Sequence, residues 1–244
     1  MRSSLHLTRR EFVGVAGLVA SGLIVAGDGA GGRSAGAEPG GKPSAAPGPD
    51  EVLRQLLEGN KRFMKGETTD PRRKPEDFAK LAEGQTPRAV VVSCADSRVP
   101  PEILFDQGVG DLFVVRVAGN VISGAGATVK GSIEYAVAEL NVSLVMVLGH
   151  TQCGAVKAAV KHISADDALP GAIAEMVSAI KPAVVKAKGQ AGDVLENAIK
   201  ANVGIGVDRL KSLEPILAGP VKRGRLKVVG GVYDLRTGGV TVIT

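Results

Sequence analysis

Short apolar runs alternate along the chain with longer segments of helical periodicity. Runs rich in β-branched residues predict buried strands, and segments with apolar positions three or four residues apart predict helices. The expected strands are residues 88–93, 111–117, 143–148 and 225–231, followed by short strands within 232–244 around a Gly238-Gly239 turn. The expected helices are residues 50–65, 76–82, 127–140, 154–162, 170–187 and 191–213, with a helical turn at 100–105.

This order of elements predicts an α/β fold with a mostly parallel central β-sheet flanked by helices. Strands joined through helices form right-handed crossovers, which place successive strands parallel in one sheet. Nearly continuous apolar strands also fit a sheet that is covered on both faces. Because open α/β sheets bind ligands outside the carboxyl ends of their strands, we expect the functional site at that edge.

The first 37 residues have the features of an export signal. Thr8-Arg9-Arg10-Glu11-Phe12-Val13 is a twin-arginine pattern, a glycine-rich apolar stretch follows at 13–26, and Ala35-Gly36-Ala37 is a small-x-small cleavage site. Residues 38–49, rich in Gly, Pro and Ala, predict a flexible linker before a single domain at 50–244. We therefore expect a periplasmic or secreted protein without membrane contact after cleavage. An uncleaved N-terminal membrane anchor is the alternative.

The charge of the chain argues against a nucleic-acid partner. The formal net charge is +5, and removing the expected signal, which carries four arginines and two acidic residues, leaves +3. Aromatic residues make up 3% of the chain and tryptophan is absent. A balanced surface without base-stacking side chains is not the composition of a nucleic-acid-binding domain.

Two cysteines and one histidine follow two of the predicted strands. Cys94 follows 88–93, whereas His150 and Cys153 follow 143–148. Two thiols and an imidazole at neighbouring strand ends can form a Cys2His zinc site whose open fourth position suits catalysis. Asp96 and Arg98 lie on the same loop as Cys94. The Asp96 carboxylate can either coordinate the zinc, which closes the site, or accept a hydrogen bond from zinc-bound water. If Arg98 holds the carboxylate in a bidentate pair, the fourth zinc position is free for water, which zinc converts to hydroxide near neutral pH and which Asp96 orients.

A disulfide between the two cysteines is the rival interpretation. An exported protein meets an oxidising compartment, and an even number of cysteines fits a bridge. A single bridge would not account for His150 at three residues from Cys153, nor for the charged pair that follows Cys94. We therefore favour the metal site.

Four ordered motifs resemble the β-class carbonic anhydrases, and the resemblance extends from Gln85 to the C-terminus. The motifs are Cys94-Ala95-Asp96-Ser97-Arg98-Val99-Pro100-Pro101-Glu102, Phe113-Val114-Val115-Arg116-Val117-Ala118-Gly119-Asn120, Ile133-Glu134-Tyr135-Ala136-Val137 and Gly149-His150-Thr151-Gln152-Cys153-Gly154-Ala155. The resemblance implies reversible hydration of carbon dioxide to bicarbonate by zinc-hydroxide attack. It implies zinc on the two cysteines and His150, an Asp96–Arg98 catalytic dyad, and a homodimer or tetramer with active sites at the subunit interface.

The resemblance also implies a substrate pocket. The residues at the matching positions are Gln85, Phe113, Ala118, Tyr135 and Gly154. Gln85 stands nine residues before Cys94, as in family members with an open zinc site. Val91 occupies the place of the tryptophan found in the branch with a regulatory bicarbonate pocket, so the open-site type is expected.

Two other functions fit the same residues. One is hydrolysis of carbon disulfide or carbonyl sulfide, linear molecules that zinc hydroxide would attack in the same way. The other is a non-catalytic zinc- or bicarbonate-binding protein. His162 is the one histidine besides His150 in the expected mature chain, and it is a candidate proton shuttle.

Overall fold

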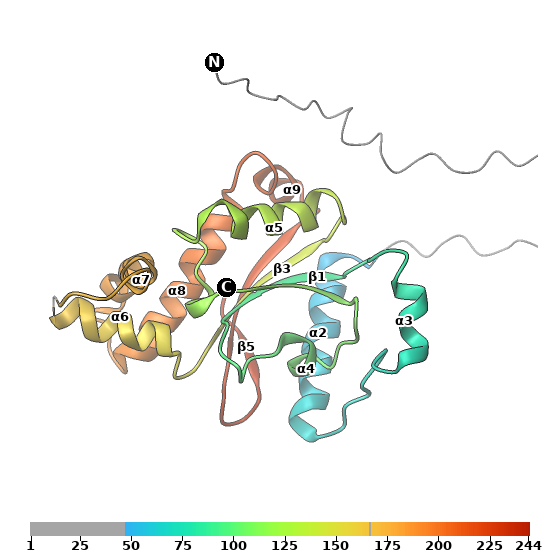
Figure 1. Ribbon diagram of the computed structural model, residues 1–244, viewed down its shortest axis with the longest axis horizontal. Helices are drawn as coiled ribbons and strands as arrows, with labels where there is room; N and C mark the ends of the chain where they lie inside the picture. The colour runs from blue at the N-terminus through green and yellow to red at the C-terminus, as the bar shows by residue number, and fades with distance from the viewer. Residues whose placement is uncertain (1–46, 166) are drawn as a thin grey trace, which may run out of the picture. The chain divides into compact units, whose positions relative to one another are not determined.

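The computed structural model describes residues 47–165 and 167–244, and Figure 1 shows their arrangement. The expected signal peptide and residues 38–46 of the expected linker lie outside the described residues. Within the part described, no helix is both long and apolar enough to cross a bilayer. The helices are α2 (Pro49–Lys65), α3 (Pro75–Leu81), α4 (Pro101–Leu104), α5 (Gly126–Ala138), α6 (Gly154–Ala165), α7 (Ile173–Ala187), α8 (Val194–Lys211) and α9 (Ala218–Lys222), with a 3-10 turn η2 (Ala118–Asn120).

Five strands form one sheet in the order β2-β1-β3-β4-β5. Strands β1 to β4 run parallel, and β5 pairs antiparallel with β4. The predicted α/β fold with a mostly parallel sheet is therefore confirmed. The strands are β1 (Ala89–Ser93), β2 (Leu112–Arg116), β3 (Leu144–His150), β4 (Lys227–Tyr233) and β5 (Val240–Val242).

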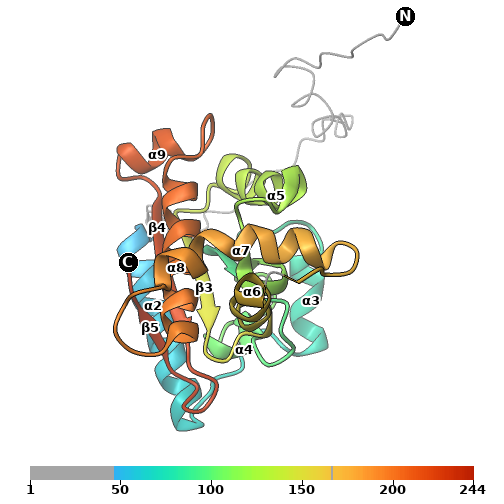
Figure 2. The ribbon, with the colours of Figure 1, turned by 90° about the vertical axis from the view of Figure 1, so that its left-hand side faces the viewer.

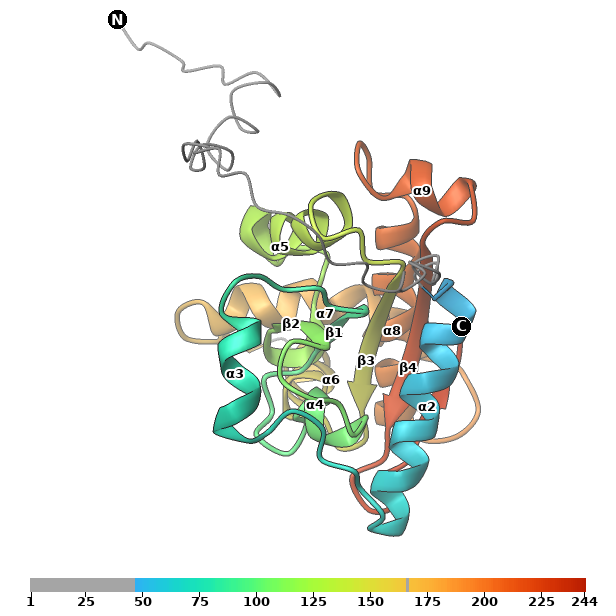
Figure 3. The ribbon, with the colours of Figure 1, turned by 90° about the vertical axis from the view of Figure 1, so that its right-hand side faces the viewer.

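Helices cover both faces of the sheet, which explains why β1 and β3 are apolar on both sides. Val90 and Val92 of β1 belong to a buried cluster with Val203 of α8, to which α5 also contributes. Val91 belongs to a cluster on the opposite face with residues of α2 and α4. Figure 3 shows α2 in front of β4, and Figure 2, from the opposite side, shows α6, α7 and α8. These three helices share a third buried cluster.

Helix α8 approaches the sheet closely at two glycines. A Cβ atom on Gly149 of β3 would lie 2.7 Å from Cγ2 of Val203, and one on Gly230 of β4 would lie 2.6 Å from its Cγ1. The valine side chain therefore fills the space that larger residues on the strands would need. This approach fixes α8 against the carboxyl end of β3 and the middle of β4.

Some boundaries differ from the predicted ones. Both β3 and β4 extend two residues beyond the predicted ends, because His150 and Tyr233 continue the ladder between them. His150 is therefore the last residue of its strand rather than the second residue after it. The pattern did not predict α9, since the prolines and glycines around it favour a loop. Burial of Leu217 and Ala218 against the core stabilises it.

Candidate metal centre and active site

The two cysteines and His150 converge at the carboxyl edge of the sheet. Cys94 directly follows β1, His150 ends β3, and Cys153 directly precedes α6. Their ligand atoms all lie within 4.8 Å of one another, and all three residues are buried. The two sulfurs are 4.0 Å apart and both cysteines are free, so the rival disulfide is absent from this structure.

The imidazole of His150 is oriented by Thr151. Its Nδ1 lies 2.9 Å from the Thr151 carbonyl oxygen, which assigns the proton to Nδ1 and leaves a lone pair on Nε2. Thr151 is itself anchored, because its amide donates to the Tyr233 carbonyl at 2.9 Å and its hydroxyl accepts from the Leu235 amide at 3.0 Å. A histidine ligand held through its second nitrogen is the usual arrangement at zinc.

His150 Nε2 is a buried nitrogen without a hydrogen-bond partner among the described residues. Buried polar atoms are rarely left unpaired, so such an atom calls for a partner. Two free sulfurs stand beside it, and thiolate with imidazole is a donor set that suits zinc. The residues present therefore fit this metal.

The surroundings of the two sulfurs favour negative charge on Cys94 and disfavour it on Cys153. The Gly119 amide donates to Cys94 Sγ at 3.2 Å. A hydrogen bond with Cys153 lowers the pKa of the Cys94 thiol, and the same contact raises the pKa of Cys153. The amides of Ala155 and Val156, at the start of α6, oppose that rise. A cation between the sulfurs would stabilise both as thiolates.

Arg98 holds the Asp96 carboxylate in a bidentate pair. Nε donates to Oδ1 at 2.9 Å and Nη2 donates to Oδ2 at 2.7 Å, while the Arg98 amide donates to Oδ1 at 3.0 Å. These hydrogen bonds from Arg98 lower the pKa of Asp96 well below its ordinary value. Oδ2 lies 3.8 Å from Nε2 of His150. The carboxylate is therefore charged, fixed, and next to the proposed metal ligands.

Arg116 is a site residue to which the sequence analysis gave no role. It ends β2 beside Ser93 and donates to the carbonyl oxygens of Cys94, at 3.0 Å, and Asp96, at 2.5 Å. The sequence feature that could have indicated this role is a charged residue at the end of an apolar strand, since the side chain of such a residue leaves the core at the functional edge of the sheet. Arg116 fixes the backbone that carries both the ligand and the carboxylate.

The five residues expected around the substrate fall into two groups. Ala118 begins η2 next to Gly119, and Gly154 begins α6 next to Cys153, so both lie beside the ligands. Gln85 is exposed before β1, at the opposite end of that strand from Cys94.

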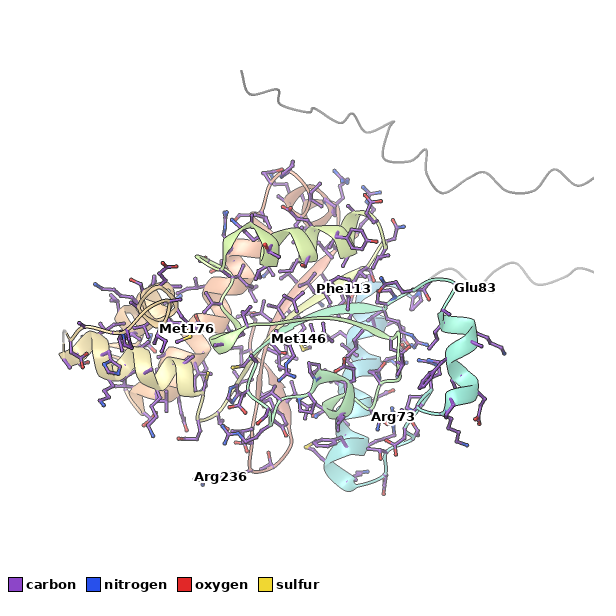
Figure 4. All side chains as sticks on the ribbon, viewed as in Figure 1. Arg73, Glu83, Phe113, Met146, Met176 and Arg236 are labelled. Carbon is purple, nitrogen blue, oxygen red and sulfur yellow. The ribbon has the colours of Figure 1, made fainter. Side chains whose placement is uncertain are left out.

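Phe113 lies on the edge strand β2, as Figure 4 shows, and pairs with Val90, four residues before Cys94. Its ring centroid is 6.3 Å from that of Tyr135, a residue of α5 that is 46% exposed. Within one chain these two aromatic residues and Gln85 do not line the metal site. His162 lies about two and a half turns along α6 from Cys153, where its Nδ1 is 2.6 Å from Asp167 Oδ1.

Comparisons with known proteins agree with this geometry. A family model described as "Carbonic anhydrase" matches residues 89–240. "Carbonic anhydrase 2" of Mycobacterium tuberculosis is 42% identical over 195 residues, covering 78% of this chain and 90% of that protein. The carbonic anhydrase of Mycolicibacterium smegmatis is 38% identical over 192 residues, covering 79% and 92%.

Solved structures give the same result for the fold. The β-carbonic anhydrase CcaA is 30% identical, with a TM-score of 0.62, and the match covers 79% of this chain and 95% of that one. The Coccomyxa β-carbonic anhydrase, solved with acetazolamide, is 29% identical with a TM-score of 0.60, covering 78% and 86%. With its sheet, its Cys-His-Cys cluster and these relatives, the chain belongs to the β-class carbonic anhydrases, and it is an enzyme of that family.

Proposed function

We propose that this protein hydrates carbon dioxide reversibly with zinc held by Cys94, His150 and Cys153. The observation that carries the proposal is the buried Nε2 of His150, which has no hydrogen-bond partner in the described part of the chain and lies beside two free sulfurs. Zinc held by these three residues would supply a water-derived nucleophile at neutral pH, since bound zinc lowers the pKa of water to about 7.

Asp96 and Arg98 orient the nucleophile in this proposal. Arg98 keeps the carboxylate charged and occupies both of its oxygens, so Asp96 accepts a hydrogen bond from the nucleophilic water instead of ligating the metal. This geometry supports the open-site type. The same hydrogen bond orients the water so that a lone pair of its oxygen points toward carbon dioxide.

We propose that the substrate pocket is completed by a second copy of the chain. Gln85, Phe113 and Tyr135 lie away from the metal ligands of their own chain, and Tyr135 is substantially exposed. A homodimer, alone or paired into a tetramer, would bring these side chains to the partner's site. Light scattering tests the assembly, and a monomer that retains full activity would contradict it.

The N-terminal pattern supports export by the twin-arginine route, with cleavage before Glu38. In an export-competent bacterial host, the periplasmic protein would then begin near Glu38. Replacing Arg9 and Arg10 together with lysine would leave the protein in the cytoplasm. An unprocessed protein in the membrane fraction would instead support the anchor.

The decisive experiment compares zinc content and carbon dioxide hydration in wild type, Cys153→Ser and Asp96→Asn. We expect one zinc per wild-type chain, loss of both zinc and activity in Cys153→Ser, and zinc without normal activity in Asp96→Asn. Wild-type protein that hydrates carbon dioxide normally without zinc would refute the mechanism.

The same preparations distinguish the two other functions. Faster turnover of carbon disulfide or carbonyl sulfide than of carbon dioxide would identify the hydrolase. Zinc without hydration at any pH would identify a binding protein.

A further inference from the structure

Asn202 is a buried residue of α8 whose side-chain amide hydrogen-bonds to the backbone beside the metal site. Its side chain is in the core, with the residue 7% exposed, and Nδ2 donates to the Gly119 carbonyl oxygen at 2.8 Å. The two residues are 83 positions apart in the chain. Asn202 belongs to none of the motifs that carry the family resemblance.

Gly119 connects this amide to Cys94. Its N–H donates to Cys94 Sγ, whereas its carbonyl accepts from Asn202, so both sides of one Cα are held. The backbone is in the left-handed region, with φ of +71°. A Cβ atom here would lie 2.9 Å from Cδ1 of Ile180 and 3.1 Å from Cβ of Ala155. Only glycine fits, and glycine is the residue that least restrains its own backbone.

We propose that Asn202 is a positioning residue for the zinc ligand Cys94. Its hydrogen bond fixes the rotation of the Gly119 backbone, and that rotation aims the N–H at the sulfur. An N–H donated to a ligand sulfur orients its lone pairs and disperses part of its charge, both of which tune the bond to a metal. The inference rests on the proposed zinc site. It implies that the orientation of one zinc ligand, Cys94, depends on the position of α8.

A purely structural role for Asn202 has a matched control elsewhere in the chain. Asn60 of α2 is also buried, at 2% exposed, and its Nδ2 donates to the carbonyls of Leu104 and Gly238 at 3.0 and 2.9 Å. These contacts join α2 to α4 and to the turn before β5, on the other face of the sheet. Asn60 Oδ1 also accepts from the Val240 amide at 2.9 Å. Loss of either amide therefore removes buried or partly buried hydrogen bonds to the backbone. Of the two residues, only Asn202 contacts the backbone that donates to Cys94.

The test compares Asn202→Leu, Asn202→Asp and Asn60→Leu with wild type. Three quantities are measured: the zinc dissociation constant by chelator competition, the sulfur-to-metal charge-transfer band of the cobalt(II) protein, and the melting temperature of the metal-free protein. We expect both Asn202 variants to raise the zinc dissociation constant about 10-fold and to shift the band. Asn60→Leu should lower the melting temperature and leave the other two quantities at their wild-type values.

The outcomes separate this inference from the proposed function. Wild type that binds no zinc refutes the zinc site itself. Wild type that binds zinc, with unchanged affinity and band in the Asn202 variants, overturns only the role of Asn202. An equal loss of zinc affinity in Asn60→Leu also overturns it, since the effect would then follow general destabilisation. Asn202→Asp keeps the side-chain shape, so it decides the question if Asn202→Leu does not fold.

Discussion

Replacing Gly149 with alanine would place a methyl group where α8 already lies. The new Cβ would be 2.7 Å from Cγ2 of Val203 and 3.4 Å from Cγ2 of Ile199. Val203 is fully buried, so its side chain cannot turn toward solvent. The helix must therefore move away from β3, or the strand must bend next to His150.

The expected cost follows from overpacking of a closed core. Extra methyl groups in well-packed interiors cost about 1–3 kcal/mol. For a domain of this size, each kcal/mol corresponds to a shift of roughly 2–4 °C in the melting temperature. Gly149→Ala should therefore lower the melting temperature by about 2–12 °C.

A compensating substitution tests whether the contact with Val203 is the cause. Val203→Ala alone removes two buried methyl groups and should cost about 1.6 kcal/mol in transfer free energy, plus a cavity term. In the double variant the methyl group at position 149 occupies part of that cavity. The two costs should then fall short of additive by about 0.5–3 kcal/mol, the range measured for residues in contact.

The assay is urea unfolding of the metal-free proteins, so that zinc binding does not add to the measured free energies. Gly204→Ala on α8 is the control, because a Cβ there meets no described atom within 4 Å apart from its chain neighbours and the adjacent backbone of its own helix. That variant should gain about 0.5–1 kcal/mol from helix propensity. Additive costs in the double variant, or wild-type stability of Gly149→Ala, would refute the close approach of α8 to β3.

Three further outcomes are expected. Arg98→Met should retain zinc but lose about 10–100-fold in hydration activity, measured by stopped flow, because Asp96 is released. The control is Arg54→Met, which should hydrate carbon dioxide at the wild-type rate. Arg54 has the same side-chain exposure as Arg98, 56%, and also pairs with carboxylates. Burial would raise the pKa of Asp106, but hydrogen bonds from the Thr69 amide and Arg62 lower it to about 2. The ionised Asp106 therefore stabilises the folded state fully above the unfolded pKa of about 3.9, and this contribution is lost as pH falls toward 2. The urea midpoints at pH 7 and pH 3 should consequently differ less in Asp106→Asn than in wild type. Chelation of zinc should lower the melting temperature of wild type, with recovery on adding zinc, and equal melting with and without the metal would count against a zinc site in the folded state.

Local patterns in the sequence determined the class of fold and the edge of the sheet that carries the site. The runs in β1 and β3 are apolar on both sides because helices cover both faces of the sheet. The burial of each strand can therefore be predicted from its own residues. Cys94 and Cys153 follow strand ends in the chain, and parallel strands bring their carboxyl ends to one edge. The family resemblance depends on the same short motifs.

Only the tertiary structure decided which distant groups support that site. The contact between Asn202 and Gly119 requires α8 to lie against the sheet at Gly149, and nothing in the periodicity of α8 specifies that approach. The two hydrogen bonds of Arg116 depend on the register between β1 and β2, and the position of His150 within β3 depends on its pairing with Tyr233. Periodicity indicates which positions of an element face the core, whereas register and helix packing determine which residues of other elements they contact. Register and packing arise only when separate elements assemble.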